Sequence, residues 1–219
     1  MHFTIENLVK IKDQINKCLI EFKKNNIPKI IAVSKTFPIE KILPLIEYGH
    51  KDFGENKVQE SLNKWRDIKH KNNDIRLHLL GKLQRNKVKS AVDIFDYIHS
   101  VDNEKLAKKI SEESIKIKKD IKIFIQINIG NEDQKSGIKV ENLFKFYEYC
   151  KDLKLNVIGL MCIPPYNQNP QKFFVEMQSL NEKLKLNELS MGMSADYLEA
   201  VQYSSTFVRI ESSIFGERN

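Results

Sequence analysis

Lys35 is the side chain whose type and position in this 219-residue sequence most directly suggest chemistry. It closes the segment KIIAVSK (29–35), whose apolar run is expected to form a buried strand. An amine in a partly desolvated pocket has a lowered pKa because burial disfavours its charged form, and the neutral amine can attack an aldehyde. Lys35 is therefore a candidate for Schiff-base formation. The alternative is a lysine whose ammonium group extends from the strand end into solvent.

Serine and arginine residues near the C-terminus could bind an anionic ligand. Ser194 precedes a helix-like stretch, and Ser212 and Ser213 precede a shorter one, so each could cap a helix whose free N–H groups attract an anion. Ordinary capping without a ligand explains the same residues equally well. Arg209 lies between apolar residues of an expected strand, so its charge must be paired or must face a polar cavity.

Two other patterns carry less weight. GNEDQKSG (130–137) is not a nucleotide-binding phosphate loop, because the spacing from Gly130 to Lys135 is one residue short and no glycine precedes the lysine. Lys135 could still face the site as a second amine. His78 and His99 occur inside expected strands and without metal-ligand spacing, so we interpret them as core residues and predict no metal site.

The composition indicates a globular chain without a membrane segment. Its hydrophobic fraction of 41% is sufficient for a core, and no apolar run reaches the roughly 18 residues of a membrane span. The net charge of +7 comes from lysines interspersed with acidic residues, which we interpret as a solvated surface, and we expect no nucleic acid partner. Three cysteines without a C-x-x-C pair, and an N-terminus without an uninterrupted apolar stretch, favour the cytoplasm.

Short strand-like segments alternate with helix-like segments along the chain. Strands are expected at 29–35, 52–56, 76–81, 97–101, 122–128, 156–162, 188–193 and 206–211. Parallel neighbours need crossover connections, which helices supply, so eight such units predict an α/β fold: a (β/α)8 TIM barrel in one domain spanning 1–219. A doubly wound open sheet is the alternative. An extra helix is expected at about residues 4–25, before the first strand.

In such a barrel the carboxyl ends of the strands form one rim, and ligands bind there. The expected strand ends place several polar groups on that rim, namely Lys35, Glu55, Asn56, His99, Ser100, Asn128, Ser194, Arg209 and Ser212, together with Met161 and Met193. The sequence therefore predicts a polar ligand site at this end of the barrel.

Eight segments together carry a resemblance to a known family. They are AVSKTFP, DFGENKVQE, HLLGKLQRNKVK, IHSVD, QINIGNEDQKSG, GLMCIPP, LSMGMSADY and VRIESSIFGER, and they follow in this order from about residue 29 to 218. They resemble the signature segments of the pyridoxal 5'-phosphate (PLP) homeostasis protein family. The resemblance implies a barrel of the alanine racemase N-terminal domain type (PLP fold type III), without a second domain, that holds PLP as a Schiff base on Lys35.

The resemblance also implies a role for each matched residue. Asn56 would lie near the cofactor ring, and Met161 would line the pocket. Arg209 would meet the pyridine nitrogen and keep it unprotonated, since arginine does not give up its proton. Ser194 and Ser212 would bind the phosphate.

Glu211 departs from the pattern that the resemblance implies, because the family usually has glycine at this position. The carboxylate would repel a phosphate if it points into the site, whereas the N–H group could still donate if the side chain points outward. Losing the glycine also removes conformational freedom from the backbone. Glu211 therefore belongs with the candidate cofactor-binding residues, and both orientations stay open.

The function implied by the resemblance is PLP binding for cofactor homeostasis, by buffering or by delivery to PLP-dependent apo-enzymes, in a monomer. A PLP-dependent amino acid racemase is the alternative. A racemase needs acid and base groups on opposite faces of the cofactor. No tyrosine or cysteine at an expected strand end pairs convincingly with Lys35, and Arg209 at the pyridine would make the ring a poor electron sink. We therefore expect a carrier without strong catalytic activity.

Overall fold

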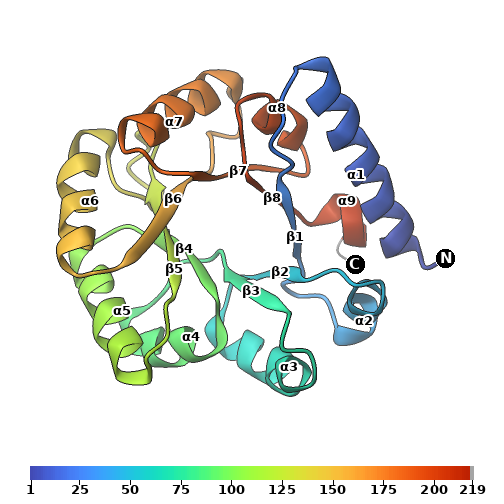
Figure 1. Cartoon of the computed structure of the whole chain (residues 1–219), viewed down its shortest axis with the longest axis horizontal. Coiled ribbons are helices and arrows are strands. Elements are labelled where there is room, and N and C mark those ends of the chain that lie inside the picture. Colours follow the sequence, from blue (N-terminus) through green and yellow to red (C-terminus); the bar gives the residue numbers. More distant parts are fainter. Residues whose placement is uncertain (218–219) are drawn as a thin grey trace.

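Eight parallel strands close into a barrel that helices surround (Figure 1). The structure is a computed structural model, and it describes residues 1–217. The strands are β1 (Lys29–Val33), β2 (Asp52–Glu55), β3 (Arg76–Leu79), β4 (Tyr97–Val101), β5 (Lys122–Ile127), β6 (Asn156–Cys162), β7 (Glu188–Met193) and β8 (Phe207–Ile210). They are neighbours in sequence order, which confirms the predicted (β/α)8 barrel.

Pairing of the first and last strands closes the sheet. β1 and β8 are parallel, and their register runs from Lys29 opposite Phe207 to Ala32 opposite Ile210. The doubly wound open sheet, which was the alternative, is therefore wrong. Several expected strands are shorter than predicted, since β1 ends at Val33 and leaves Lys35 in the turn that follows it.

Helices cover the outside of the barrel. They are α1 (Phe3–Glu21), α2 (Ile39–Glu47), α3 (Val58–Lys71), α4 (Val88–Ile94), α5 (Glu104–Ile117), α6 (Leu143–Asp152), α7 (Gln171–Lys183), α8 (Tyr197–Gln202) and α9 (Ser212–Phe215). Of these, α2 to α8 lie between successive strands, α1 precedes β1 and α9 follows β8. Two 3-10 turns, η1 (Arg85–Lys87) and η2 (Val140–Asn142), precede α4 and α6. Because each crossover contains a helix, neighbouring strands can run parallel, as the alternating sequence pattern predicts.

The extra N-terminal helix is present as α1 and lies beside α8 and α9 (Figure 1). Leu8, Ile11 and Ile15 form its buried face at helical spacing. The helix ends at Glu21, earlier than residue 25, because the chain turns at Lys23, whose φ is +50°. A left-handed residue of this kind commonly stops a helix.

Apolar side chains pack in two separate clusters. The larger cluster fills the layer between the strands and the helices, and it includes Ala32, Phe53 and Val208. The smaller cluster lies apart from it and consists of Ile31, Val33, Tyr97, Phe124, Met161 and Phe207. Neighbouring strand residues thus belong to different clusters, as expected when successive side chains point alternately into the barrel and towards the helices.

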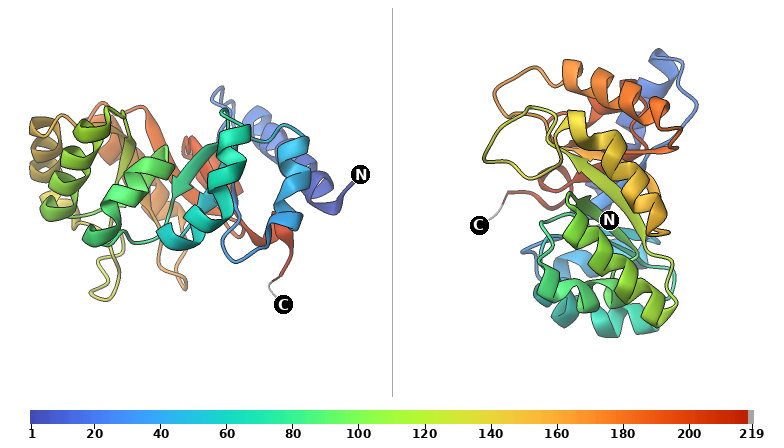
Figure 2. Two further views of the ribbon diagram at one scale, coloured as in Figure 1. Left: turned by 90° about the horizontal axis from the view of Figure 1, so that it is seen from below. Right: turned by 90° about the vertical axis from the view of Figure 1, so that its left-hand side faces the viewer.

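Two long loops project from one end of the barrel. They follow β5 and β6, and both views of Figure 2 show them extending beyond the helices on one side. Since each loop follows the carboxyl end of its strand, this side is the rim where the sequence predicts the ligand site. Within residues 1–217, no helix is both long enough and apolar enough to cross a membrane.

Two buried histidines lie inside the barrel, as the sequence predicts for His78 and His99. His78 stacks on Tyr97 with ring centroids 4.3 Å apart, and His99 stacks on Phe124 at 4.2 Å. Burial lowers the pKa of both rings, that of His99 more strongly. His78 also contacts Asp52, and although burial alone would raise the pKa of this carboxyl group, hydrogen bonds from Arg76 and His78 hold it well below its usual range.

These buried groups predict that the protein loses stability in acid. Below about pH 6.5 the unfolded chain protonates its histidines while His78 and His99 stay neutral in the fold, so the free energy of unfolding falls as the pH falls. Asp52 adds a further loss below about pH 4, because the unfolded chain then protonates this carboxyl group while the fold keeps it ionised. Urea unfolding at pH 7, 6, 5 and 4 measures this dependence. Stability that is constant or rises from pH 7 to pH 5 would contradict it.

Candidate functional site

A cavity of about 600 Å³ opens at the carboxyl ends of the strands. Residues from the ends of seven strands, all except β4, line it. All seven candidate residues are among them: Lys35, Asn56, Met161, Ser194, Arg209, Glu211 and Ser212. Lys135, the second amine, lines the same cavity. The barrel thus brings together residues that are up to 177 positions apart in the sequence.

Lys35 forms an ion pair with Glu211 inside this cavity. The Lys35 Nζ lies 2.9 Å from the Glu211 Oε2, and their side chains are 23% and 19% exposed. The two residues meet because they follow β1 and β8, which are paired where the barrel closes. Of the two orientations left open for Glu211, the structure shows the one in which the carboxylate faces the site.

The backbone at Glu211 does not need a glycine. Its φ of −114° is negative and so lies outside the left-handed region that favours glycine. Glu211 therefore changes the charge of the site, whereas the expected loss of backbone freedom has no consequence at this position. Its N–H group donates to the Ser194 Oγ at 3.1 Å.

The residue before Lys35 is held by a buried polar cluster. The Ser34 hydroxyl donates to the Glu55 Oε1 at 2.9 Å, and the Lys64 Nζ donates both to the Ser34 carbonyl at 2.9 Å and to the same Glu55 oxygen at 3.0 Å. The Trp65 Nε1 also donates to this oxygen, at 2.9 Å. Sequence analysis did not identify Lys64 or Trp65, although Glu55 was placed on the rim.

The residue after Lys35 has a constrained backbone. Thr36 has a φ of +66°, which is unusual for a β-branched residue. Its N–H group donates to the Glu60 Oε1 at 2.9 Å, and the Phe37 N–H group donates to the Ser34 carbonyl at 3.2 Å, which closes a tight turn around Lys35. Both flanks of the lysine are therefore fixed, so the Lys35 side chain projects from a defined backbone position.

Ser194 does not cap α8, contrary to the prediction. The N-cap of that helix is Asp196, two residues later, whose carboxylate accepts from the Met193 N–H group at 2.6 Å. The Ser194 Oγ instead accepts from the N–H groups of Glu211 at 3.1 Å and Ser213 at 3.5 Å. The serine thus lies next to the start of α9 because β7 and β8 are neighbours.

Asn56 and Met161 lie on opposite parts of the cavity wall. Met161 is fully buried and belongs to the smaller apolar cluster. Asn56 follows β2 and lies against the loop after β3, where a Cβ atom on Gly81 would come within 2.3 Å of the Asn56 carbonyl oxygen. Only glycine at position 81 allows the two loops to approach this closely.

Arg209 is almost completely buried, with 4% of its surface exposed. Its Nη1 donates to the Ser190 carbonyl at 2.6 Å and to the Ser190 Oγ at 2.7 Å, and its Nη2 donates to the Cys162 carbonyl at 2.8 Å. Burial lowers the pKa of the guanidinium group. No carboxylate of residues 1–217 forms an ion pair with it, so neutral oxygen atoms supply its direct contacts.

The charge of the cavity favours an anionic ligand. The charged residues that line it within the described chain are the cations Lys35, Lys82, Lys135 and Arg209 and one carboxylate, Glu211. Lys135 is partly engaged, because its Nζ lies 2.6 Å from the Glu132 Oε2 and donates to the Pro164 carbonyl at 3.3 Å.

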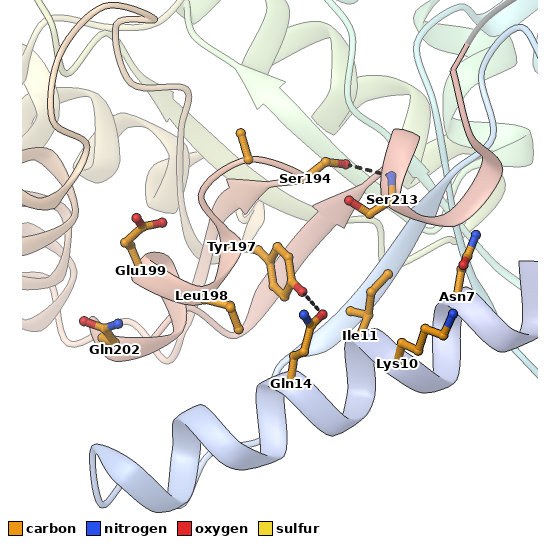
Figure 3. Close-up of a pocket in the computed structure, with 11 residues that line it drawn as sticks. Asn7, Lys10, Ile11, Gln14, Ser194, Tyr197, Leu198, Glu199, Gln202 and Ser213 are labelled. Atoms are coloured by element: carbon orange, nitrogen blue, oxygen red, sulfur yellow. Dashed lines mark hydrogen bonds between the residues drawn. The ribbon is translucent and has the colours of Figure 1, made fainter.

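A second cavity, of about 530 Å³, lies behind Ser194 between α1 and α8 (Figure 3). Ser194 and Ala195 line both cavities. The Tyr197 hydroxyl donates to the Gln14 Oε1 at 2.6 Å and ties the turn after β7 to α1 (Figure 3). The N-terminal helix thus supports the segment that contains Ser194.

Comparisons with known proteins agree with this architecture. The family described as "Alanine racemase, N-terminal domain" matches residues 7–219. A protein of Aquifex aeolicus named "Pyridoxal phosphate homeostasis protein" is 37% identical over 224 residues, which cover 97% of each chain. The solved structure of PipY from Synechococcus elongatus without PLP is 30% identical, with a TM-score of 0.86, and covers 98% of this chain and 100% of that one. The structure of PipY with PLP bound is 31% identical, with a TM-score of 0.81, and covers 92% of this chain and 100% of that one.

The fold and the lysine at its rim define a barrel of the alanine racemase N-terminal domain class. Within that class, 37% identity over nearly the full length of a relative leads to a narrower assignment. The chain belongs to the family of pyridoxal phosphate homeostasis proteins.

Proposed function

We propose that this protein binds PLP covalently through Lys35 and buffers or delivers it, without strong catalytic activity of its own. The observation that carries the proposal is the meeting of Lys35, Arg209 and the Ser194 segment in one cation-rich cavity. When bound, PLP supplies an aldehyde that condenses with a lysine amine. Support also comes from the PLP-bound structure of PipY and from the names of the relatives.

The residues present fit the chemical groups of PLP. The aldehyde would meet Lys35, and the phosphate would lie near Ser194 and Ser212, where the N–H groups of Glu211 and Ser213 already converge on a single oxygen atom. Main-chain N–H groups gathered in this way suit an anion. Asn56, Met161 and Arg209 would surround the ring. We thus propose a cofactor-binding role for all seven candidate residues, to which Glu211 would contribute its main-chain N–H group and not its carboxylate.

The composition of the cavity supports a carrier more than a racemase. Its described lining residues include no tyrosine, histidine or cysteine that could act as the second acid or base opposite Lys35. The remaining groups that can transfer a proton are Glu211, which is paired with Lys35, and the lysines at positions 82 and 135.

PLP-dependent apo-enzymes in the cytoplasm are the proposed recipients, and the three buried free thiols suit such a reducing compartment. We propose that the protein acts as a monomer. Light scattering of the purified protein measures its molar mass in solution and tests this proposal.

The test is to locate the bound cofactor. The purified protein is mixed with PLP, treated with borohydride to make any imine permanent, digested, and analysed by mass spectrometry. The expected product is a single modified peptide with the cofactor on Lys35, and modification spread over exposed lysines would overturn the proposal. Incubation of the loaded protein with L-amino acids tests the absence of catalysis, since rapid formation of D-isomers would establish the racemase instead.

A further inference from the structure

We infer that a one-directional chain of hydrogen bonds through the barrel interior holds Arg209 in place at the ligand site. We call this chain the relay, and it consists of Asp52, His78, His99, Ser190 and Arg209. Asp52, His78, His99 and Ser190 would thus act as positioning residues for the cavity. The relay itself is a property of the protein alone. Only the identity of the ligand that Arg209 faces rests on the proposed function.

The relay is continuous from one end of the barrel to the other. Asp52 begins β2, at the end of the barrel remote from the cavity, and its Oδ1 lies 3.0 Å from the His78 Nε2. The His78 Nδ1 lies 3.0 Å from the His99 Nε2. The His99 Nδ1 lies 2.9 Å from the Ser190 Oγ, which accepts from the Arg209 Nη1 at 2.7 Å. The four hydrogen bonds thus connect residues of five strands, β2, β3, β4, β7 and β8, and the link from β4 to β7 spans the barrel interior.

The chemistry of the two ends determines the direction of every bond. Asp52 is ionised and can only accept, so His78 must carry its proton on Nε2. Since burial keeps His78 neutral, its Nδ1 is an acceptor and receives the Nε2–H of His99. The same argument applies to the neutral His99 ring, whose Nδ1 must receive the hydroxyl hydrogen of Ser190.

The Ser190 oxygen is therefore left as an acceptor for Arg209, which can only donate. Each group donates towards Asp52, so the negative charge of that carboxylate polarises the whole chain and strengthens its last bond. This arrangement explains how the barrel tolerates a buried guanidinium without a direct carboxylate partner among residues 1–217. Two of the donors of Arg209 are held by Ser190 and one by Cys162, so the group has one orientation at the cavity wall.

Packing and charge around the relay leave little room for an alternative orientation. His99 lies against Phe124 and Phe207, and His78 lies against Tyr97 and Phe207, so water does not separate the two rings. At the far end, the Arg76 Nε and Nη2 donate to Asp52 at 2.7 Å and 2.5 Å and keep the carboxylate ionised. A proton added to Nδ1 of His78 would place two donors face to face with His99.

Nitrogen-15 NMR of the histidine rings, recorded without PLP, tests the relay independently of the proposed function. We expect two rings, assigned through the variants His78→Phe and His99→Phe, that carry the proton on Nε2 and do not titrate between pH 7.5 and 5.5. Replacing Ser190 by alanine should change the Nδ1 shift of His99, because the ring loses its donor, whereas threonine should restore it. A proton on Nδ1 of either ring, or an alanine variant with unchanged shifts, would overturn the relay.

PLP titration of the same variants measures the consequence at the site. Ser190→Ala should weaken binding about tenfold, and Ser190→Thr should bind within about twofold of the wild-type chain. Asp52→Asn, at the far end of the barrel, should also weaken PLP binding. Thermal unfolding shows whether this variant folds. Asp96→Asn is the matched control, since Asp96 also accepts from a lysine and a main-chain N–H group but lies outside the relay. Equal affinity of Ser190→Ala and the wild-type chain would overturn the positioning role.

Discussion

Replacing Lys35 by alanine is expected to abolish covalent attachment of PLP and the visible absorption band that accompanies it. The substitution removes the only amine that the turn between Ser34 and Phe37 presents to the cavity, while the anchors on Glu55 and Glu60 stay in place. The residual affinity then depends on noncovalent contacts with phosphate and ring. We expect Kd to rise roughly 100-fold, which corresponds to about 2.7 kcal/mol.

Lys135→Ala is the matched control for this experiment. Lys135 lines the same cavity and is also paired with a glutamate, but it comes from the loop after β5 and lies outside the anchored turn. Its loss should leave the absorption band intact and change Kd by about threefold at most, as expected for a partly exposed charge. A full band in Lys35→Ala, together with its loss in Lys135→Ala, would move the attachment site to the second amine.

Replacing Glu211 by glutamine is expected to tighten PLP binding about tenfold, or about 1.4 kcal/mol. Two effects act in the same direction. The Glu211 carboxylate, 2.9 Å from the Lys35 Nζ, holds the amine in an ion pair that must break before the amine attacks an aldehyde. The carboxylate also faces the cavity in which a phosphate would bind near Ser194, and like charges repel. Glutamine keeps the size of the side chain and removes only the charge.

Two further variants separate charge from backbone effects at this position. Glu211→Gly should tighten binding to a similar extent, because a φ of −114° needs no glycine and only the carboxylate matters. Glu132→Gln removes the partner of Lys135 in an equivalent ion pair and should leave Kd unchanged. Binding is measured by titration with PLP and by the rate of band formation at pH 7 and pH 8. Weaker binding in Glu211→Gln would show that the carboxylate supports the cofactor.

Alternation along single strands made much of the site predictable. Ile31, Val33 and Lys35 follow one another at every second position, and so do Phe207, Arg209 and Glu211. In a strand such residues share a face, so Ile31, Val33, Phe207 and Arg209 point into the barrel, and Lys35 and Glu211 follow just beyond the two strand ends. The seven candidate residues line one cavity, as their places near the expected strand ends and the family resemblance implied, although their contacts with a cofactor remain a prediction.

The sequence pattern predicted a wrong N-cap at Ser194, because the hydrogen-bond partners of this serine follow another strand. Ser194 looks like an N-cap because a helix-like stretch follows it, but its hydroxyl accepts from N–H groups of Glu211 and Ser213 instead. The helix starts later, after Asp196, which accepts from the main chain of its own turn. Sequence spacing describes neighbours along the chain, and it contains no information about a strand that joins the sheet about 15 residues later.

The sequence by itself determined the barrel and the lysine at its rim, because short apolar strands and the helices between them are local properties of the chain. The tertiary structure alone decided that Glu211 is paired with Lys35, that Lys64 and Glu55 anchor the lysine turn, and that a relay leads from Asp52 to Arg209. These contacts depend on the closure of β1 on β8 and on the register between neighbouring strands, which only the folded barrel establishes.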